Sequence, residues 1–289
     1  MLLSLGIVAG AIVSSPAPSG GTSTSGIVRA DTTFGYIEVE AADARAAISE
    51  GEAAQVAARE VLALHNVRFG IATPRSLRDN WVTLSPSGKP VYSWVFSNKS
   101  ADRNHRPPSH VLRHEIGHDL FIRYLVPSSR QDQYGGDAPD WLDEMAAVAF
   151  EDEKLTASRR RQAARFAKED TLIPLSRYLS MSHPEALAGA PATPTKQVRM
   201  RLATSAESPQ FYAMGRAFYD FLVDRTKNKA IIAELAAAFR SGQPLEQWIL
   251  TRTGYLEKPD GLLVMDADLQ SFIALDERYA NHPKSEAGQ

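Results

Sequence analysis

The feature that most constrains the fold is a pair of histidines, His114 and His118, which stand four residues apart. On an α-helix this spacing places both imidazoles on one face, about 6 Å apart along the axis. Two such rings can converge on one tetrahedral metal ion. Glu115 is rotated by about 100° from His114, so its carboxylate can flank the metal without being a ligand. The segment therefore predicts a helix carrying the His-Glu-x-x-His arrangement of a zinc hydrolase, with Glu115 as general base.

The residues around this motif support a helix. Ser109 follows two prolines and is a good N-cap, so the helix is expected to run from there to about Leu125, where Val126-Pro127 stops it. Gly117 lies inside the motif, where its small size would let another element approach the metal-binding face.

A catalytic zinc site takes three protein ligands and a water, so a third ligand is needed. The spacing of metzincins is excluded, because Phe121 and Tyr124 stand where Gly and His would be required. A second helix is expected from Pro139 to about Glu153, after a loop that lets it return beside the first.

Glu144 of this second helix is the expected third ligand. The small residues Ala146, Ala147 and Ala149 would let the two helices pack closely. Asp140 and Asp143 are the alternative ligands; otherwise they are acidic residues favoured by the helix dipole.

This pair of helices resembles the gluzincin zinc peptidases of the M1-like peptidase MA group, whose second helix commonly reads W-L-x-E-G-x-A. The chain has Trp141-Leu142-Asp143-Glu144-Met145-Ala146-Ala147, with Met145 in place of the usual Gly. The 25 residues between His118 and Glu144 are more than in the best-known gluzincins. The segment from Phe211 to Leu222 looks like a later helix of these proteins, and Leu245 to Gly254 like their C-terminal helix. The resemblance covers about residues 90–280, most strongly at the metal motifs.

The resemblance implies a zinc peptidase with one zinc ion bound by His114, His118 and Glu144. The metal would lower the pKa of a bound water, and Glu115 would take its proton and pass it to the leaving amine. Tyr212 would donate a hydrogen bond to the oxyanion, with Tyr219 as its rival for this role. A peptide or protein substrate could be held along the strand at 91–96 by β-addition.

The implied fold class is α+β and zincin-like, with a small N-terminal β-sheet, an active-site helix and an α-helical C-terminal lobe. We expect three parts, which are a signal-like segment and linker over 1–28, an α/β subdomain over 29–126, and a helical subdomain over 127–289. Within them the sequence predicts a linker to residue 30, a strand over 34–40, a helix over 41–66, and a hairpin of 81–84 with 91–96. Further helices are expected over 156–168, 171–181, 208–225, 228–240, 244–252 and 265–280.

Composition limits the partners. The chain has no cysteine, which excludes thiolate ligands, and its net charge of −2 gives no reason to expect nucleic acid as a partner. Arg159, Arg160 and Arg161 form a short basic run that we interpret as a solvated helix face. The apolar run from Leu2 to Val13 is too short to span a bilayer and resembles a signal peptide, although no basic residue precedes it. We therefore expect a periplasmic or secreted protein without stable membrane insertion.

Several alternatives remain open from the sequence. The same metal chemistry would serve a zinc hydrolase with a non-peptide substrate, and a zincin scaffold can also act as a binding module without turnover. Asp119 and Glu151 are candidates for orienting the ligating histidines, although acidic helix residues are more often solvated. No Gly-x-Met-x-Asn segment is present, so aminopeptidase activity is not predicted.

Overall fold

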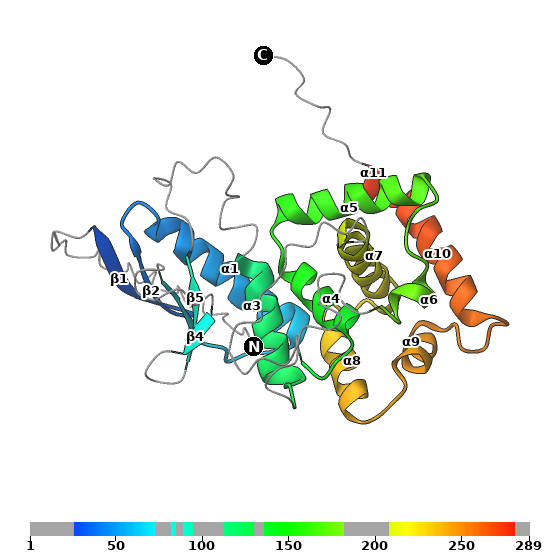
Figure 1. The fold of residues 1–289 in the computed structure, drawn as a ribbon, viewed down its shortest axis with the longest axis horizontal. Helices are drawn as coiled ribbons and strands as arrows, with labels where there is room; N and C mark the ends of the chain where they lie inside the picture. The colour runs from blue at the N-terminus through cyan, green and yellow to red at the C-terminus, as the bar shows by residue number, and fades with distance from the viewer. Residues whose placement is uncertain are drawn as a thin grey trace, which may run out of the picture.

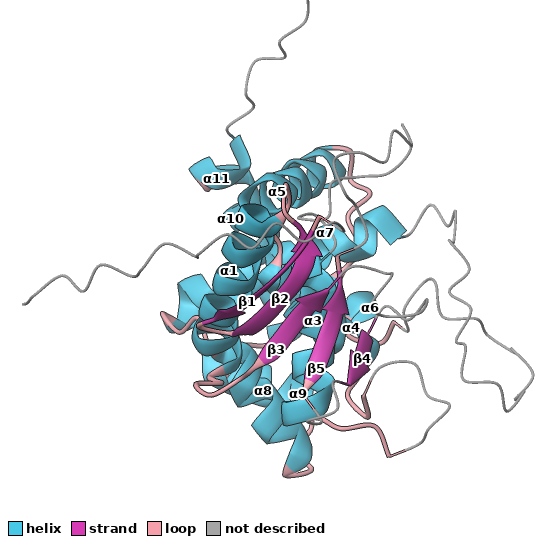
Figure 2. Cartoon of the chain, turned by 90° about the vertical axis from the view of Figure 1, so that its left-hand side faces the viewer, coloured by secondary structure: helices cyan, strands magenta, loops and turns pink. Residues whose placement is uncertain are grey.

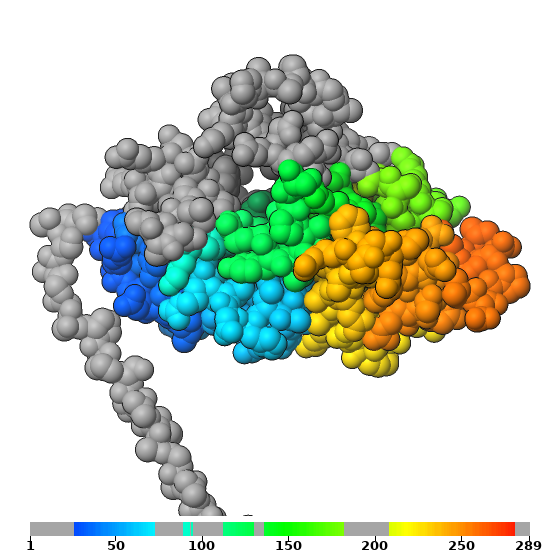
Figure 3. All heavy atoms as spheres, turned by 90° about the horizontal axis from the view of Figure 1, so that it is seen from below, coloured from blue at the N-terminus to red at the C-terminus, as the bar shows by residue number. Residues whose placement is uncertain are grey.

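The computed structural model describes residues 26–72, 82–84, 89–94, 112–129, 136–181 and 208–280. Over these ranges the chain has a mixed α+β fold, with a small sheet in its N-terminal part and mostly helices in its C-terminal part. The sheet lies at one end of the molecule in Figure 1, α1 and α3 lie in the middle, and the later helices form the other end. Figure 3 shows the same order along the long axis, from blue N-terminal residues to orange C-terminal residues.

The sheet has five strands in the order β1-β2-β3-β5-β4. Their bounds are Ile27–Thr32 for β1, Gly35–Glu40 for β2, Phe69–Ala72 for β3, Val82–Leu84 for β4 and Pro90–Ser93 for β5. The two outer pairs, β1 with β2 and β4 with β5, are antiparallel, whereas β2, β3 and β5 run parallel. In Figure 2 the sheet faces the viewer, with α3, α4 and α8 behind it. The predicted strand over 34–40 and the predicted hairpin are thus confirmed.

Two strands were not expected. Residues 27–30, assigned from the sequence to the linker, form the first part of β1, which pairs along its full length with β2. Its side chains alternate only weakly in burial, so the strand depends on backbone pairing with β2 rather than on a hydrophobic pattern. All four residues of β3 are buried between two neighbours, so this strand shows no alternation of polar and apolar residues.

The helices that bear on the site are α1, α3, the π-helical turn η2, α4, α5 and α7. Their bounds are Ala44–Leu62, Leu112–Leu120, Phe121–Leu125, Asp140–Phe150, Glu153–Lys168 and Ser208–Thr226. The remaining helices are α6, α8, α9, α10 and α11, which span Leu175–Tyr178, Ile231–Arg240, Leu245–Thr253, Gly261–Leu275 and Glu277–Ala280.

The sequence overestimated two of these helices. Of the helix predicted over 171–181, only the short helix α6 forms. Pro174 directly precedes α6 and disfavours helical backbone at Ile173. The helix predicted over 265–280 is two helices, since Asp276 adopts an extended backbone (ψ 123°) between α10 and α11.

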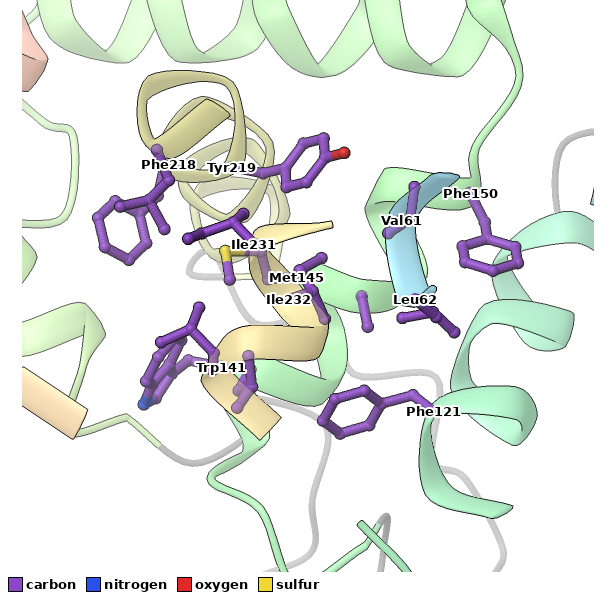
Figure 4. Close-up of a cluster of buried hydrophobic side chains, with 14 of the residues drawn as sticks. Val61, Leu62, Phe121, Trp141, Met145, Phe150, Phe218, Tyr219, Ile231 and Ile232 are labelled. Carbon is purple, nitrogen blue, oxygen red and sulfur yellow. The ribbon is translucent and has the colours of Figure 1, made fainter. Parts of the chain in front are cut away.

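One cluster of buried side chains runs through both parts of the described chain. Helix α1 joins the parts, because it packs against β2, α3, α4 and α8. Figure 4 shows where they meet, with side chains converging from α1, η2, α4, α7 and α8 that include Val61, Phe121, Met145, Tyr219 and Ile232. Helices α3 and α4 are thus held between the sheet and the helical layer.

No helix among the described residues is long and apolar enough to cross a membrane. The signal-like run over 2–13 and the predicted N-cap Ser109 lie outside the described residues.

Candidate metal centre

Three side chains from α3 and α4 converge on one point. Oxygens of the Glu144 carboxylate lie 3.1 Å from Nε2 of His114 and 3.5 Å from Nε2 of His118. The two Nε2 atoms are 3.2 Å apart, and one donor atom from each of the three residues falls within a set no more than 4.8 Å across. The structure therefore brings together the three residues that the sequence predicted as ligands, and they could hold a metal ion.

Close packing of two helices makes this convergence possible. A Cβ atom added at Gly117 would lie 3.0 Å from Cα of Ala147 and 3.1 Å from Cγ of Phe150, which leaves no room for a side chain. The expectation that Gly117 admits a neighbouring element is confirmed, and the element is α4. Glu144 is 1% exposed, so α4 presents its carboxylate to the two histidines from a buried position.

Both histidines are also held from behind. Nδ1 of His114 lies 3.1 Å from Oε1 of Glu151, and Nδ1 of His118 lies 2.9 Å from Oδ1 of Asp143. Because carboxylates accept, each Nδ1 carries the hydrogen and donates it, which leaves Nε2 of each ring directed at Glu144. Metal-binding histidines in proteins are commonly oriented this way.

This arrangement corrects two interpretations of the sequence. Asp143 is not placed as an alternative third ligand, because its carboxylate is engaged with the far side of His118. Asp119 does not orient a histidine; it accepts hydrogen bonds from Tyr92 at 2.6 Å and from Arg123 at 2.6 and 3.0 Å. Glu151, the other candidate for an orienting residue, does contact His114.

The two histidines and Glu144 shift one another's pKa values in the direction that favours the charged forms. Burial alone would lower the pKa of His114, but the charge of Glu144 and hydrogen bonds to Glu144 and Glu151 outweigh it and raise this pKa to about 9. For His118 burial is outweighed in the same way by Asp143 and Glu144, and its pKa lies well above the usual value. Burial would raise the pKa of Glu144, yet the two imidazoles hold it well below its usual range.

The donor set fits a divalent cation such as zinc. Two imidazole nitrogens and one carboxylate oxygen are the protein ligands of many catalytic zinc sites. A divalent cation would also replace the protons that now balance the buried Glu144 carboxylate.

Glu115 follows His114 on α3 and is partly buried. Its carboxylate makes no hydrogen bond or ion pair within the part of the chain that the structure describes. The other acidic residues of this region, Asp119, Asp143 and Glu151, are each engaged with a basic or phenolic group. Among these acidic side chains of the described residues, Glu115 is the one without such a partner.

The two candidate tyrosines occupy different places on α7. The ring of Tyr212 lies edge-on to His114, with centroids 5.9 Å apart. Tyr219 points elsewhere, since its hydroxyl donates to the carbonyl of Lys229 at 3.0 Å. Of the two, Tyr212 is the one beside the metal ligands.

The sequence suggested that the basic run of α5 is a solvated helix face, and the structure shows that it is not. Arg159 binds Glu151, with Nη2 3.0 Å from Oε1, and its guanidinium lies 4.4 Å from the centroid of the Tyr212 ring. Arg160 is paired with the buried Asp220 at 2.8 Å. No sequence pattern signals these contacts, because Glu151 lies beyond the end of α4 and Asp220 lies on α7.

The strand expected to bind a peptide along its edge is an inner strand. The segment at 90–93 forms β5, which is paired on both sides, by β3 and β4. Among the described strands on this side of the sheet, β4 is the outermost, so the role proposed for 91–96 cannot belong to β5.

Comparison with known proteins found no match among family models, curated proteins or solved structures.

Proposed function

We propose that this protein is a zinc-dependent hydrolase that cleaves peptide bonds, with His114, His118 and Glu144 as the metal ligands. The observation that carries the proposal is the convergence of both Nε2 atoms on Glu144 while both Nδ1 atoms donate to carboxylates. Chance pairing of surface histidines would not produce two buried orienting carboxylates. We also infer a zincin-like arrangement, which the position of α3 between the sheet and α4 supports.

A zinc ion in this site would polarise a water and lower its pKa towards neutrality. Glu115 would accept a proton from that water and return it to the leaving amine, since no described residue competes for its carboxylate. Tyr212, beside His114, would donate its hydroxyl hydrogen to the oxygen of the attacked carbonyl. Glu151 and Asp143 would hold the imidazoles in the tautomer that directs Nε2 to the ligand position.

The test compares the parent protein with Glu115→Gln and Glu144→Ala. Zinc content is measured by elemental analysis, and turnover is measured on a fluorogenic peptide mixture with and without a chelator. We expect about one zinc in the parent and in Glu115→Gln, a large loss of zinc in Glu144→Ala, and turnover only in the parent.

Other outcomes would redirect the proposal. Full activity in Glu115→Gln would refute the general-base role. Zinc binding without peptide cleavage would leave the ligands in place and point to a non-peptide substrate or to a binding module. No zinc in the parent would refute the metal site itself.

A further inference from the structure

We infer that Arg159, anchored on Glu151, is a positioning residue of this site that holds the ring of Tyr212 beside His114. Four side chains form a closed ring of contacts. Arg159 binds Glu151, Glu151 accepts from His114, the His114 ring meets Tyr212 edge-on, and Tyr212 lies under the guanidinium of Arg159.

The contact with Glu151 is made by the fork of the guanidinium. Nη2 lies 3.0 Å from Oε1, and Nε lies 3.3 Å from each oxygen of the same carboxylate. Two nitrogens on one carboxylate fix the plane of the guanidinium as well as its position, which a lysine ammonium cannot do. The side chain of Arg159 is 15% exposed and that of Glu151 is fully covered, so solvent screens this pair only weakly.

That fixed plane is what Tyr212 packs against. Its ring centroid is 4.4 Å from Cζ of Arg159, within the range of a cation–π contact. The ring also meets His114, with centroids 5.9 Å apart at 63°. Together the two contacts restrict the position of the ring, and hence the place of its hydroxyl.

The contacts come from four separate parts of the fold. Arg159 lies on α5, Tyr212 on α7, His114 on α3, and Glu151 directly after α4. Arg159 therefore ties the tyrosine to a metal ligand across elements that are not consecutive in the chain. Its effect on turnover rests on the proposed function, whereas its effect on the Tyr212 ring does not.

The test uses Arg159→Met, which keeps the length of the side chain and removes its charge and plane, and Arg159→Lys, which keeps the charge. Arg161→Met is the matched control, since Arg161 stands two residues away on α5 and has no hydrogen bond or ion pair with the described residues. Each variant is made with Tyr212 and with Tyr212→Phe, which retains the ring and removes the hydroxyl.

Turnover is measured on the fluorogenic peptide mixture. With Tyr212 present, we expect Arg159→Met to keep about one zinc and lose about tenfold in kcat with KM within about twofold, because a displacement below 1 Å is enough for such a loss. Arg159→Lys should recover only part of it, and Arg161→Met should resemble the parent. In the Tyr212→Phe background the loss from Arg159→Met should fall below about twofold. An equal loss in both backgrounds would overturn the inference, as would loss of zinc from both Arg159 variants.

A second measurement does not depend on turnover. In protein labelled with ¹³C-tyrosine, the ring signals of Tyr212 are identified by their absence in Tyr212→Phe. We expect them to move in Arg159→Met and to stay in place in Arg161→Met. If the parent cleaves no peptide, the proposed function fails, but the Tyr212 signals still test the role of Arg159. Unmoved signals in Arg159→Met would refute that role whether or not the protein is a peptidase.

Discussion

The spacing of α3 and α4 can be tested by adding a single methyl group at Gly117. A Cβ atom there would lie 3.0 Å from Cα of Ala147, and 3.1 and 3.3 Å from Cγ and Cβ of Phe150. Carbon atoms in good contact are about 3.5–4.0 Å apart, so the helices must separate by a few tenths of an ångström. Overpacking of this kind costs about 1–3 kcal/mol, whereas replacing glycine in a helix returns about 1 kcal/mol. Gly117→Ala should therefore lower the free energy of unfolding by about 0–2 kcal/mol.

The larger effect should be on metal binding. Two ligands lie on α3 and the third on α4, so separating the helices moves Glu144 away from both imidazoles at once. Metal–ligand distances tolerate only about 0.2 Å, and we expect zinc affinity to fall by about tenfold or more. The affinity is measured by competition with a chromophoric chelator, and the stability of the metal-free protein by urea denaturation.

Gly51→Ala is the matched control. Its Cβ would meet ring atoms of Phe34 at 2.2–2.6 Å rather than any atom of α3 or α4. We expect Gly51→Ala to lose at least as much stability as Gly117→Ala and to keep zinc affinity within about twofold of the parent. If Gly117→Ala bound zinc as tightly as the parent, the close approach of α3 and α4 would not be what fixes the site.

Three further predictions follow from the charged groups. Asp143→Asn should weaken zinc binding by about 10–100-fold in the same competition assay, because it removes the carboxylate that orients His118; unchanged affinity would contradict that role. Asp220→Asn should cost about 3–5 kcal/mol in urea denaturation and leave zinc affinity unaltered, since it strands two arginines that pair with this buried carboxylate. Burial opposes ionisation of Asp220, but Arg216 and Arg160 hold its pKa at about 2. The ionised carboxylate should therefore contribute about 2 kcal/mol to the free energy of unfolding. This contribution should be complete above pH 3.8 and lost as pH falls through about 2, and the Asn variant should lack this pH dependence. Zinc binding at pH 7 should release at least one proton, because the pKa of His114 is about 9 without metal and a ligating imidazole must be neutral. The release is measured by calorimetry in buffers of different ionisation enthalpy, and the apparent zinc affinity should rise with pH up to about 9. Binding without proton release would refute this prediction.

Local sequence patterns predicted the elements that are specified locally. The His-Glu-x-x-His segment and the Trp141–Ala147 segment each carry a local helical signal and form helices as expected, and the strands at 82–84 and 90–93 pair antiparallel as predicted. Strand β1 instead depends on pairing with β2, and β3 on burial between two strands. Neither dependence can be read from the four to six residues involved, and so both strands were missed.

The candidate site divides in the same way. Spacing predicted His114 and His118, since residues four apart on one helix must share a face. Glu144 was predicted from a second helix that returns beside the first and from the resemblance carried by the Trp141–Ala147 segment. Of the two residues behind the histidines, Glu151 was a candidate from the sequence and Asp143 was not, because the choice depends on tertiary competition. Asp119 follows His118 directly and is a natural candidate to orient it, yet Tyr92 and Arg123 occupy its carboxylate, and Asp143 takes the role instead.

Two buried ionic clusters lie in the helical part of the described chain, and their difference bears on function. Around Asp220 the carboxylate is balanced by Arg160 and Arg216, which keep their charge at any physiological pH and make a permanent structural link. Around Glu144 the balance comes from two histidines, whose protons can leave when a metal ion takes their place on Nε2. A purely structural pair gains nothing from partners that can be discharged. A metal site requires them, because the protons that neutralise the carboxylate in the empty protein must depart when the cation arrives. The choice of histidine in one cluster and arginine in the other is therefore an argument for metal binding that is independent of the sequence motif.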